Sequence, residues 1–128
     1  MSMFRVAVVA ANPKQEELTT PPVDALVDTG SELSWLPSDA LKSAGITPRR
    51  ERSFRTATNE VVKRDVGFAI VRAEGFETVD EVVFAEPGDQ ILLGVRTIEG
   101  FGVIVDNIGH RFVATTTTVA RLKQLTFQ

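Results

Sequence analysis

The chain has 128 residues, of which 43% are hydrophobic and 24% are charged, a composition typical of one ordinary globular domain. We therefore expect a single domain over residues 1–128. The formal net charge of −3 provides no basic surface for a nucleic acid or an anionic membrane, so neither is expected as a partner. The sequence has no cysteine, which excludes disulfides, thiolate catalysis and zinc–thiolate sites.

The N-terminal apolar run, residues 6–11, is shorter than the core of a signal peptide and far shorter than a membrane span. We expect it to belong to a first strand, Phe4 to Ala11, of a soluble, cytoplasmic protein. Val, Ile, Thr and Phe dominate the apolar positions of the chain, and strand-like runs alternate with turn residues. This pattern predicts an all-β domain.

The first strand is followed by a polar, proline-containing stretch, Asn12 to Pro22, which is expected to be a loop. Val23 to Asp28 is expected to be a second, buried strand that ends at Thr29-Gly30-Ser31. A short helix should come next, because Ser38 is a natural N-cap and Gly45 is a natural stop.

The middle of the chain predicts two β-hairpins in succession. The first turns at Thr58-Asn59, since Asn tolerates a left-handed turn position, and the second turns at Glu74-Gly75. The strands that flank these turns are expected at Phe54–Ala57, Glu60–Val66, Gly67–Ala73 and Glu77–Ala85. The arginine-rich stretch from Arg49 to Arg55 is interpreted as a solvated surface strand rather than a phosphate site.

The last third begins with a turn at Pro87-Gly88-Asp89 and a short apolar strand, Ile91-Leu92-Leu93, which Gly94 ends. A helix of one or two turns is expected from Arg96 to Phe101. The strands and turn of a final hairpin are expected at Val103–Val105, Arg111–Ala114 and Asn107-Ile108-Gly109. Residues 115–128 fit either a strand or a helix.

The segment most informative about chemistry is the apolar strand that runs into Asp28 and breaks at Gly30. A carboxylate beside apolar residues is costly to bury unless it is hydrogen-bonded or shares a proton with a partner. Gly30 permits a tight turn and close approach of the backbone to a ligand, and the hydroxyls of Thr29 and Ser31 flank the acid. Alone, the triplet Asp28-Thr29-Gly30 favours the simpler interpretation of a strand that ends in an Asp turn, because three-residue matches arise by chance.

With its second element, Ile91-Leu92-Leu93-Gly94, the segment Asp28-Thr29-Gly30-Ser31 resembles the retropepsin-like, or retroviral-type, aspartic proteases. The first matches that family's active-site loop, and the second matches the apolar residues before a glycine whose strand supports the loop. The hairpin at Thr56-Ala57-Thr58-Asn59-Glu60 sits where the family has its flap. The resemblance covers Phe4 to Ala114, extends to small bacterial aspartyl protease-like proteins, and implies an all-β, single-lobed acid protease barrel with one or two short helices.

The resemblance implies an aspartic endopeptidase with two catalytic aspartates. Asp28 with Trp35 and Pro37 is also similar to the N-terminal lobe of pepsin-like enzymes, but the chain is too short for a second lobe. A second Asp28 would therefore come from another copy in a two-fold homodimer. The pair would share one proton and activate water against a peptide or protein substrate, with no metal or organic cofactor. The open alternatives are a dimeric peptide-binding module with this fold and weak or no activity, and an unrelated β-protein with an accidental triplet.

Individual roles also follow from the resemblance. Thr29 would form a hydrogen bond across the dimer, Gly30 would offer its carbonyl to the substrate, and Ser31 would donate a hydrogen bond to the outer oxygen of Asp28. The flap at residues 56–60 would close over an extended peptide. Glu32 fits the acidic residue that follows the loop in retroviral enzymes.

Several other residues have structural interpretations. The arginine that would face Glu32 comes one position later than in the family, at Arg96, which leaves a Glu32–Arg96 ion pair open. Trp35 is expected to fill core, and His110 is expected to lie on the surface. The remaining aspartates lack metal-ligand spacing and are expected at surface or turn positions: Asp24, Asp65, Asp80, Asp89 and Asp106.

Overall fold

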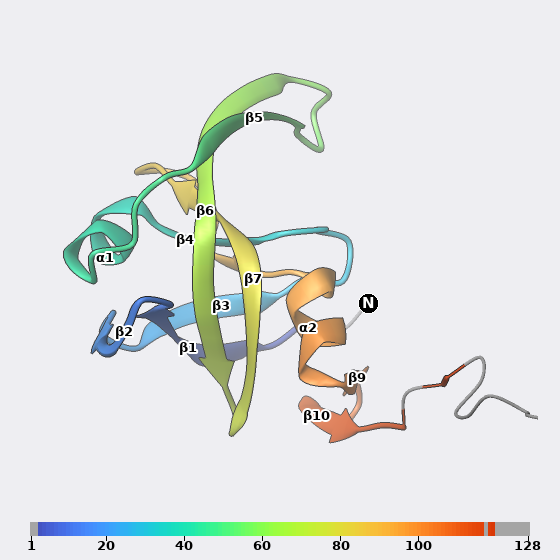
Figure 1. Ribbon diagram of the computed structural model, residues 1–128. Helices are drawn as coiled ribbons and strands as arrows, with labels where there is room; N and C mark the ends of the chain where they lie inside the picture. Colours follow the sequence, from blue (N-terminus) through green and yellow to red (C-terminus); the bar gives the residue numbers. More distant parts are fainter. Residues whose placement is uncertain (1–2, 117, 120–128) are drawn as a thin grey trace, which may run out of the picture.

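The computed structural model describes residues 3–116, 118 and 119, and it is built mostly of strands (Figure 1). The strands are β1 Arg5–Asn12, β2 Gln15–Thr19, β3 Val23–Val27, β4 Ser34–Pro37, β5 Arg50–Arg55, β6 Val61–Ala73, β7 Phe76–Ala85, β8 Leu92–Leu93, β9 Val103–Asp106 and β10 Arg111–Ala114. The helices are α1 Ser38–Ser43 and α2 Val95–Phe101. The all-β expectation with two short helices is confirmed. Most of the ambiguous segment 115–128 lies outside the described residues.

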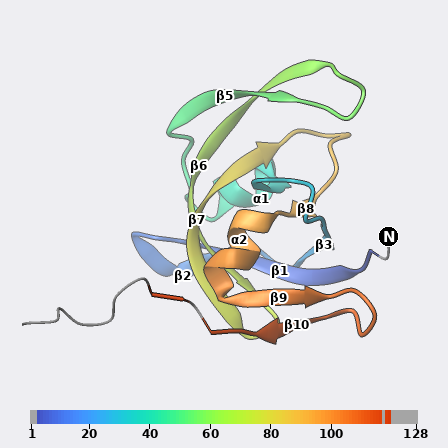
Figure 2. The ribbon, with the colours of Figure 1, turned by 90° about the vertical axis from the view of Figure 1, so that its right-hand side faces the viewer.

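Eight strands form one sheet in the order β2-β1-β3-β8-β4-β7-β6-β5, while β9 and β10 form a separate two-stranded sheet (Figure 2). An additional pairing joins β1 to β6, with Val8 opposite Ala73 and Ala11 opposite Ile70. This pairing curls the sheet around the hydrophobic core. In the described part of the chain the sheet curls strongly but does not close into a complete barrel.

The alternation of buried and exposed residues along a strand shows which of its faces packs against the hydrophobic core. In β1 the side chains of Val6, Val8 and Ala10 are buried, whereas those of Arg5 and Ala7 are exposed. This period of two is typical of a strand with one face packed inward. The main hydrophobic cluster lies between the strands of the curled sheet and α2.

A smaller hydrophobic cluster lies near β5. It consists of buried Leu33, Val66 and Val83, with Trp35 and Phe54 packed against it. It links the β5–β6 hairpin to β4 and β7, so the hairpin is attached to the body of the molecule by side-chain packing as well as by the backbone.

Two expectations about the secondary structure of the first 45 residues are wrong. The stretch expected to be a loop contains β2, which pairs with β1 although all five of its residues are exposed. Ser38 does not cap α1: the residue at the N-cap is Pro37, no side chain caps the helix, and Ser38 is buried in the first turn. Gly45 does follow the helix as expected, with φ of +75°.

The two hairpin turns are confirmed. Asn59, Glu74 and Gly75 have φ of 69°, 53° and 84°, the left-handed conformation that such turns require. The separate strands expected on either side of Gly67 are instead one strand, β6, of 13 residues. A Cβ at Gly67 would lie 2.6 Å from the carbonyl oxygen of Thr47, so glycine allows β6 to pass this segment without a break.

No described helix combines the length and the apolar character needed to cross a bilayer.

Candidate active site

Asp28 follows the last residue of β3, at a point where β3 lies beside β8. The two strands pair in parallel, with Leu26 opposite Leu92 and Val27 opposite Leu93. The backbone N–H of Asp28 donates to the carbonyl of Leu93 at 3.0 Å. The two segments singled out in the sequence are therefore adjacent in space.

The Asp28 loop also rests on the turn that leads into α2. A Cβ on Gly94 would lie 2.4 Å from the carbonyl oxygen of Leu33 and 2.9 Å from that of Ser31, so only glycine permits this approach. The N–H groups of Val95 and Arg96 donate to the carbonyls of Ser31 and Glu32, at 2.8 and 3.0 Å. Backbone contacts with the residues at the start of α2 thus hold the Asp28 loop in place.

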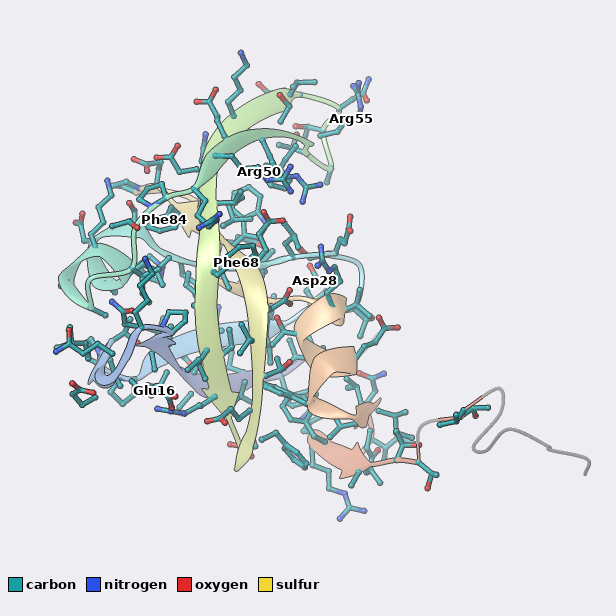
Figure 3. The ribbon with its side chains drawn as sticks, in the orientation of Figure 1. Glu16, Asp28, Arg50, Arg55, Phe68 and Phe84 are labelled. Atoms are coloured by element: carbon teal, nitrogen blue, oxygen red, sulfur yellow. The ribbon has the colours of Figure 1, made fainter. Side chains whose placement is uncertain are left out.

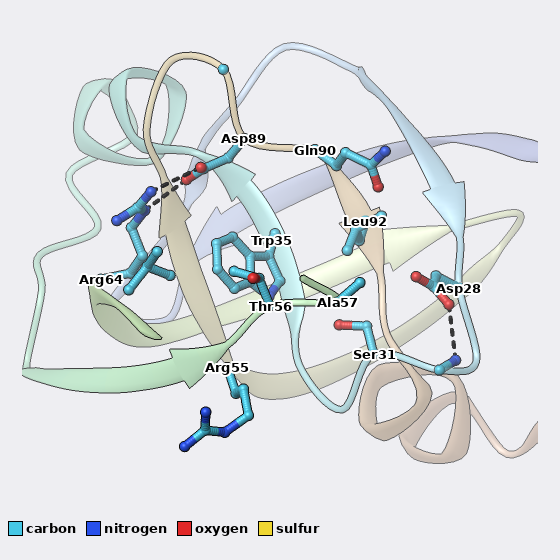
Figure 4. A pocket seen from close by; sticks show the side chains of 13 residues that line it. Asp28, Ser31, Trp35, Arg55, Thr56, Ala57, Arg64, Asp89, Gln90 and Leu92 are labelled. Carbon is cyan, nitrogen blue, oxygen red and sulfur yellow. Dashed lines mark hydrogen bonds and ion pairs between the residues drawn. The ribbon is translucent and has the colours of Figure 1, made fainter. Parts of the chain in front are cut away.

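The carboxyl group of Asp28 is half-buried and receives one hydrogen bond. The N–H of Gly30 donates to its Oδ1 at 2.9 Å (Figure 4). The expectation for Ser31 is wrong in this chain, because its hydroxyl donates to the carbonyl of Leu33 at 2.7 Å. Within the described residues, Oδ2 of Asp28 receives no hydrogen bond. One carboxylate oxygen is therefore available to a water, a substrate or a second carboxyl group.

A cleft of about 560 Å³ opens beside Asp28. Its walls come from the Asp28 loop, from the β5–β6 hairpin and from the segment before β8 (Figure 4). The lining residues are Asp28, Gly30, Ser31, Trp35, Arg55, Thr56, Ala57, Val62, Arg64, Gly88, Asp89, Gln90 and Leu92. A volume of this size accommodates several side chains of a peptide.

The β5–β6 hairpin, called the flap hairpin below, covers this cleft. Figure 3 shows Asp28 beneath the end of the hairpin that carries Arg55. Thr56 N–H donates to the carbonyl of Glu60 at 2.7 Å, and Arg55 donates to Oδ1 of Asn59 at 3.0 Å, which orders the tip.

The structure brings together only part of the expected site. From the flap, Thr56 and Ala57 line the cleft with Asp28, whereas the other three expected residues, Thr58, Asn59 and Glu60, are exposed and do not line it. From the segment Ile91-Leu92-Leu93-Gly94, Leu92 alone lines the cleft. The other expected site residues outside the cleft lining are Thr29, Ile91, Leu93 and Gly94.

Residues 17–97 match the model of a family described as aspartyl protease, a span that includes the Asp28 loop, the flap hairpin and β8. The chain belongs to this aspartyl protease family. A foamy viral protease–reverse transcriptase, solved in complex with double-stranded DNA, has a similar structure, with a TM-score of 0.51 and 18% sequence identity over 74% of this chain. The similarity confirms a single-lobed, retropepsin-like fold, although this chain spans 14% of that longer chain. No curated protein matches the sequence.

Trp35 is a lining residue that the family resemblance did not identify. It was expected to fill core, and it does pack edge-on against Phe54, with ring centroids 5.1 Å apart. Its other side, however, faces the cleft. The sequence feature that could have identified Trp35 as a cleft residue is its position directly after the Asp28 loop, on the strand β4.

Arg64 and Asp89 are two further residues of the cleft that sequence reasoning missed. The Arg64 guanidinium donates to Asp89 through Nε at 2.7 Å and through Nη2 at 2.9 Å. The Arg64 hydrogen bonds lower the pKa of Asp89 below its ordinary value of 3.8, a backbone bond from Glu86 lowers it further, and burial opposes both. Asp89 does lie in the expected turn.

The arginine-rich stretch is not simply solvated. Glu81 on β7 is only 8% exposed, and it accepts bonds from Arg50 at 3.0 Å and from Arg52 at 3.1 Å. These bonds, chiefly that from Arg50, lower the pKa of Glu81 against the opposing effect of burial. The first strand of the flap hairpin is thereby fastened to the sheet by a shared buried carboxylate.

The remaining aspartate and histidine expectations have mixed outcomes. Asp80 is 8% exposed, so the surface or turn position expected for it is wrong. His110 is exposed as expected, and its ring stacks on Phe4 at 5.2 Å. A Glu32–Arg96 ion pair is present, at 3.8 Å. No group of three or more potential metal ligands occurs among the described residues.

Proposed function

We propose that the protein is a homodimeric aspartic endopeptidase, in which the Asp28 carboxyl groups of two copies activate one water molecule. The observation that carries the proposal is the position of Asp28. It lies beside a peptide-sized cleft, beneath the flap hairpin, with Oδ1 held by Gly30 and Oδ2 available. Membership of the aspartyl protease family supports the same chemistry.

Two carboxyl groups at close range cannot both ionise, so the pair shares one proton. The ionised Asp28 accepts a proton from the water molecule while the water oxygen bonds to the peptide carbonyl carbon. The protonated Asp28 of the other copy donates its proton to the carbonyl oxygen. The C–N bond then breaks as a proton passes to the departing nitrogen. These roles belong to the pair and not to either copy.

A second copy is the best source of the second carboxyl group. Asp89 shares the cleft, but both of its oxygens accept hydrogen bonds from Arg64. Glu32 is 3.8 Å from Arg96 and does not line the cleft. Two-fold symmetry would place an identical, unpaired Asp28 opposite the first.

Digestion of a peptide library at mildly acidic pH tests the activity. We expect the wild type to cleave within extended peptides, and Asp28→Asn to lose cleavage because Asn cannot act as a base. Asp24→Asn is the matched control, since Asp24 lies on β3, the strand that leads to Asp28, with its side chain 70% exposed. Cleavage that persists in Asp28→Asn would show that another group, or a contaminant, does the chemistry.

Subunit mixing tests the shared site. When wild type is refolded with an equal amount of Asp28→Asn, activity should fall to about half that of the same wild-type amount alone, because mixed pairs lack one carboxyl group. Unchanged activity would mean that each chain acts alone. A stable dimer that binds peptides and cleaves none would instead support the peptide-binding alternative. The cytoplasmic location remains a prediction, which cell fractionation would check.

A further inference from the structure

A chain of hydrogen bonds runs through the interior behind the Asp28 loop and ends on Asp80. The N–H of Gly94 donates to Ser34 Oγ at 2.9 Å. Ser34 Oγ lies 2.6 Å from Thr97 Oγ1, and Thr97 Oγ1 donates to Asp80 Oδ2 at 3.0 Å. Ser34 and Thr97 are fully buried, and Asp80 is 8% exposed. The chain connects β4, α2 and β7 to the turn beneath the active-site loop.

The bond from Thr97 to Asp80 sets the direction of every other bond in this chain. The Thr97 hydroxyl is the donor in this bond, so its single hydrogen is used there. Thr97 Oγ1 then accepts from the Ser34 hydroxyl, whose own oxygen accepts from Gly94 N–H. Each donor is used once. The reverse direction between Ser34 and Thr97 would leave both a buried hydroxyl hydrogen and the carboxylate oxygen unpaired, which is costly.

The other oxygen of Asp80 is also held. Oδ1 accepts from the N–H of Glu81 at 2.8 Å and lies 3.6 Å from Nη2 of Arg96. The same guanidinium lies 3.8 Å from Glu32, just after the Asp28 loop. Asp80 is thus connected to the loop region through Gly94 on one path and through Arg96 on the other.

The Gly94 turn is the point where this chain meets the candidate active site. Gly94 lies against the carbonyls of Ser31 and Leu33, and the next residue, Val95, donates to Ser31. On the other side, Asp28 N–H donates to Leu93. When the bond to Ser34 holds the peptide group between Leu93 and Gly94 in one orientation, the backbone before and after the Asp28 side chain is held as well.

We propose that Asp80 is a positioning residue for Asp28, acting through Thr97, Ser34 and Gly94. Its effect on the rate rests on the proposed peptidase function, because small displacements of a catalytic group slow a reaction strongly. Its effect on the order of the Asp28 loop is independent of that function.

Thr97→Val tests the proposal, because it removes the middle of the chain while keeping the volume of the side chain. We expect amide hydrogen exchange at Asp28 and Val95 to become about tenfold faster, and kcat to fall about tenfold with KM little changed, the equivalent of one lost buried hydrogen bond. Thr97→Ser should restore both quantities. Ser34→Ala, which adds no volume, should act like Thr97→Val and serves if that variant does not fold.

Thr20→Val is the matched control. Thr20 is 3% exposed, and its hydroxyl oxygen accepts a buried hydrogen bond from Ala10 N–H at 3.0 Å, in the β1–β2 region. It should lower the Tm without changing exchange at Asp28 and Val95. Wild-type exchange at these amides in folded Thr97→Val and Ser34→Ala, or an equal increase in Thr20→Val, would overturn the proposal. Absence of peptide cleavage by the wild type would refute the proposed function, while hydrogen exchange would still decide whether the hydrogen-bond chain that ends on Asp80 orders the Asp28 loop.

Discussion

Arg64 on the flap hairpin and Asp89 in the segment before β8 form a two-bond ion pair, with N–O distances of 2.7 and 2.9 Å. Their side chains are only 20% and 17% exposed, although both line the cleft. The ion pair connects the flap hairpin, which covers the cleft, to the segment before β8, which forms one of its walls. Among the described residues, no backbone hydrogen bond joins Arg64 directly to Asp89.

Asp89→Asn should lower the free energy of unfolding by about 1 kcal/mol near neutral pH, because it removes one partner of a largely covered pair. Since the pKa of Asp89 is lowered in the folded state, this stabilisation is fully present above its ordinary value of 3.8. It is lost as the pH falls through the lower, folded-state value. Urea unfolding across this range checks the expectation, and a wild-type-to-variant difference that does not shrink with acid would contradict it.

Glu81→Gln should lower the free energy of unfolding by about 2 kcal/mol, because Arg50 and Arg52 lose the buried carboxylate that they share. Glu77→Gln is the matched control: Glu77 lies on β7 like Glu81 and pairs with Arg72 on β6, but its side chain is 57% exposed, so its loss should change the Tm little. Thermal unfolding of both variants provides the measurement. Equal shifts in Tm would show that the Glu81 cluster contributes no more than a surface pair.

Gly94→Ala should destabilise the protein by about 3 kcal/mol or more, since the new methyl group would lie 2.4 Å from the backbone oxygen of Leu33. Gly102→Ala makes a useful comparison. Gly102 has φ of +74° and open space around its Cα, so only the cost of a left-handed conformation applies, about 1 kcal/mol. Chemical denaturation separates the two effects, and a smaller loss at Gly94 than at Gly102 would count against the tight approach.

Trp35 should report on peptide binding. It is the single tryptophan of the sequence and lines the cleft, so its fluorescence should change when a peptide binds to Asp28→Asn, which is expected not to cleave it. Trp35→Phe should abolish the signal. Unchanged emission at saturating peptide, with binding established by calorimetry, would place the peptide elsewhere.

Sequence patterns predicted the elements that have strong local signals. β1 follows from its run of apolar residues, and the turns at Asn59 and Gly75 follow from residues that tolerate positive φ. By contrast, β2 has no buried residue, so its pairing with β1 leaves no trace in the hydrophobic pattern. Glu81 was missed because its arginine partners lie on another strand, and only the register of the sheet brings them together.

The candidate site was predictable where it is contiguous in sequence. Asp28 and its loop were recognised from one short segment, and Leu92 from another. Arg64 and Asp89 are 25 residues apart and belong to different elements, so their pairing depends on how the flap hairpin folds over the cleft. Asp80 had no local signal either, because its burial results from the packing of α2 against β7.

The 13 residues of β6 form one uninterrupted strand that extends from the flap hairpin to the turn at Glu74-Gly75. At about 3.3 Å per residue, such a strand is about 40 Å long. The flap hairpin that covers the cleft therefore contains one end of β6, and the other end of this continuous strand leads to an exposed turn on the far side of the molecule. A force or a label applied at that distant turn acts on the same strand that a bound peptide would touch.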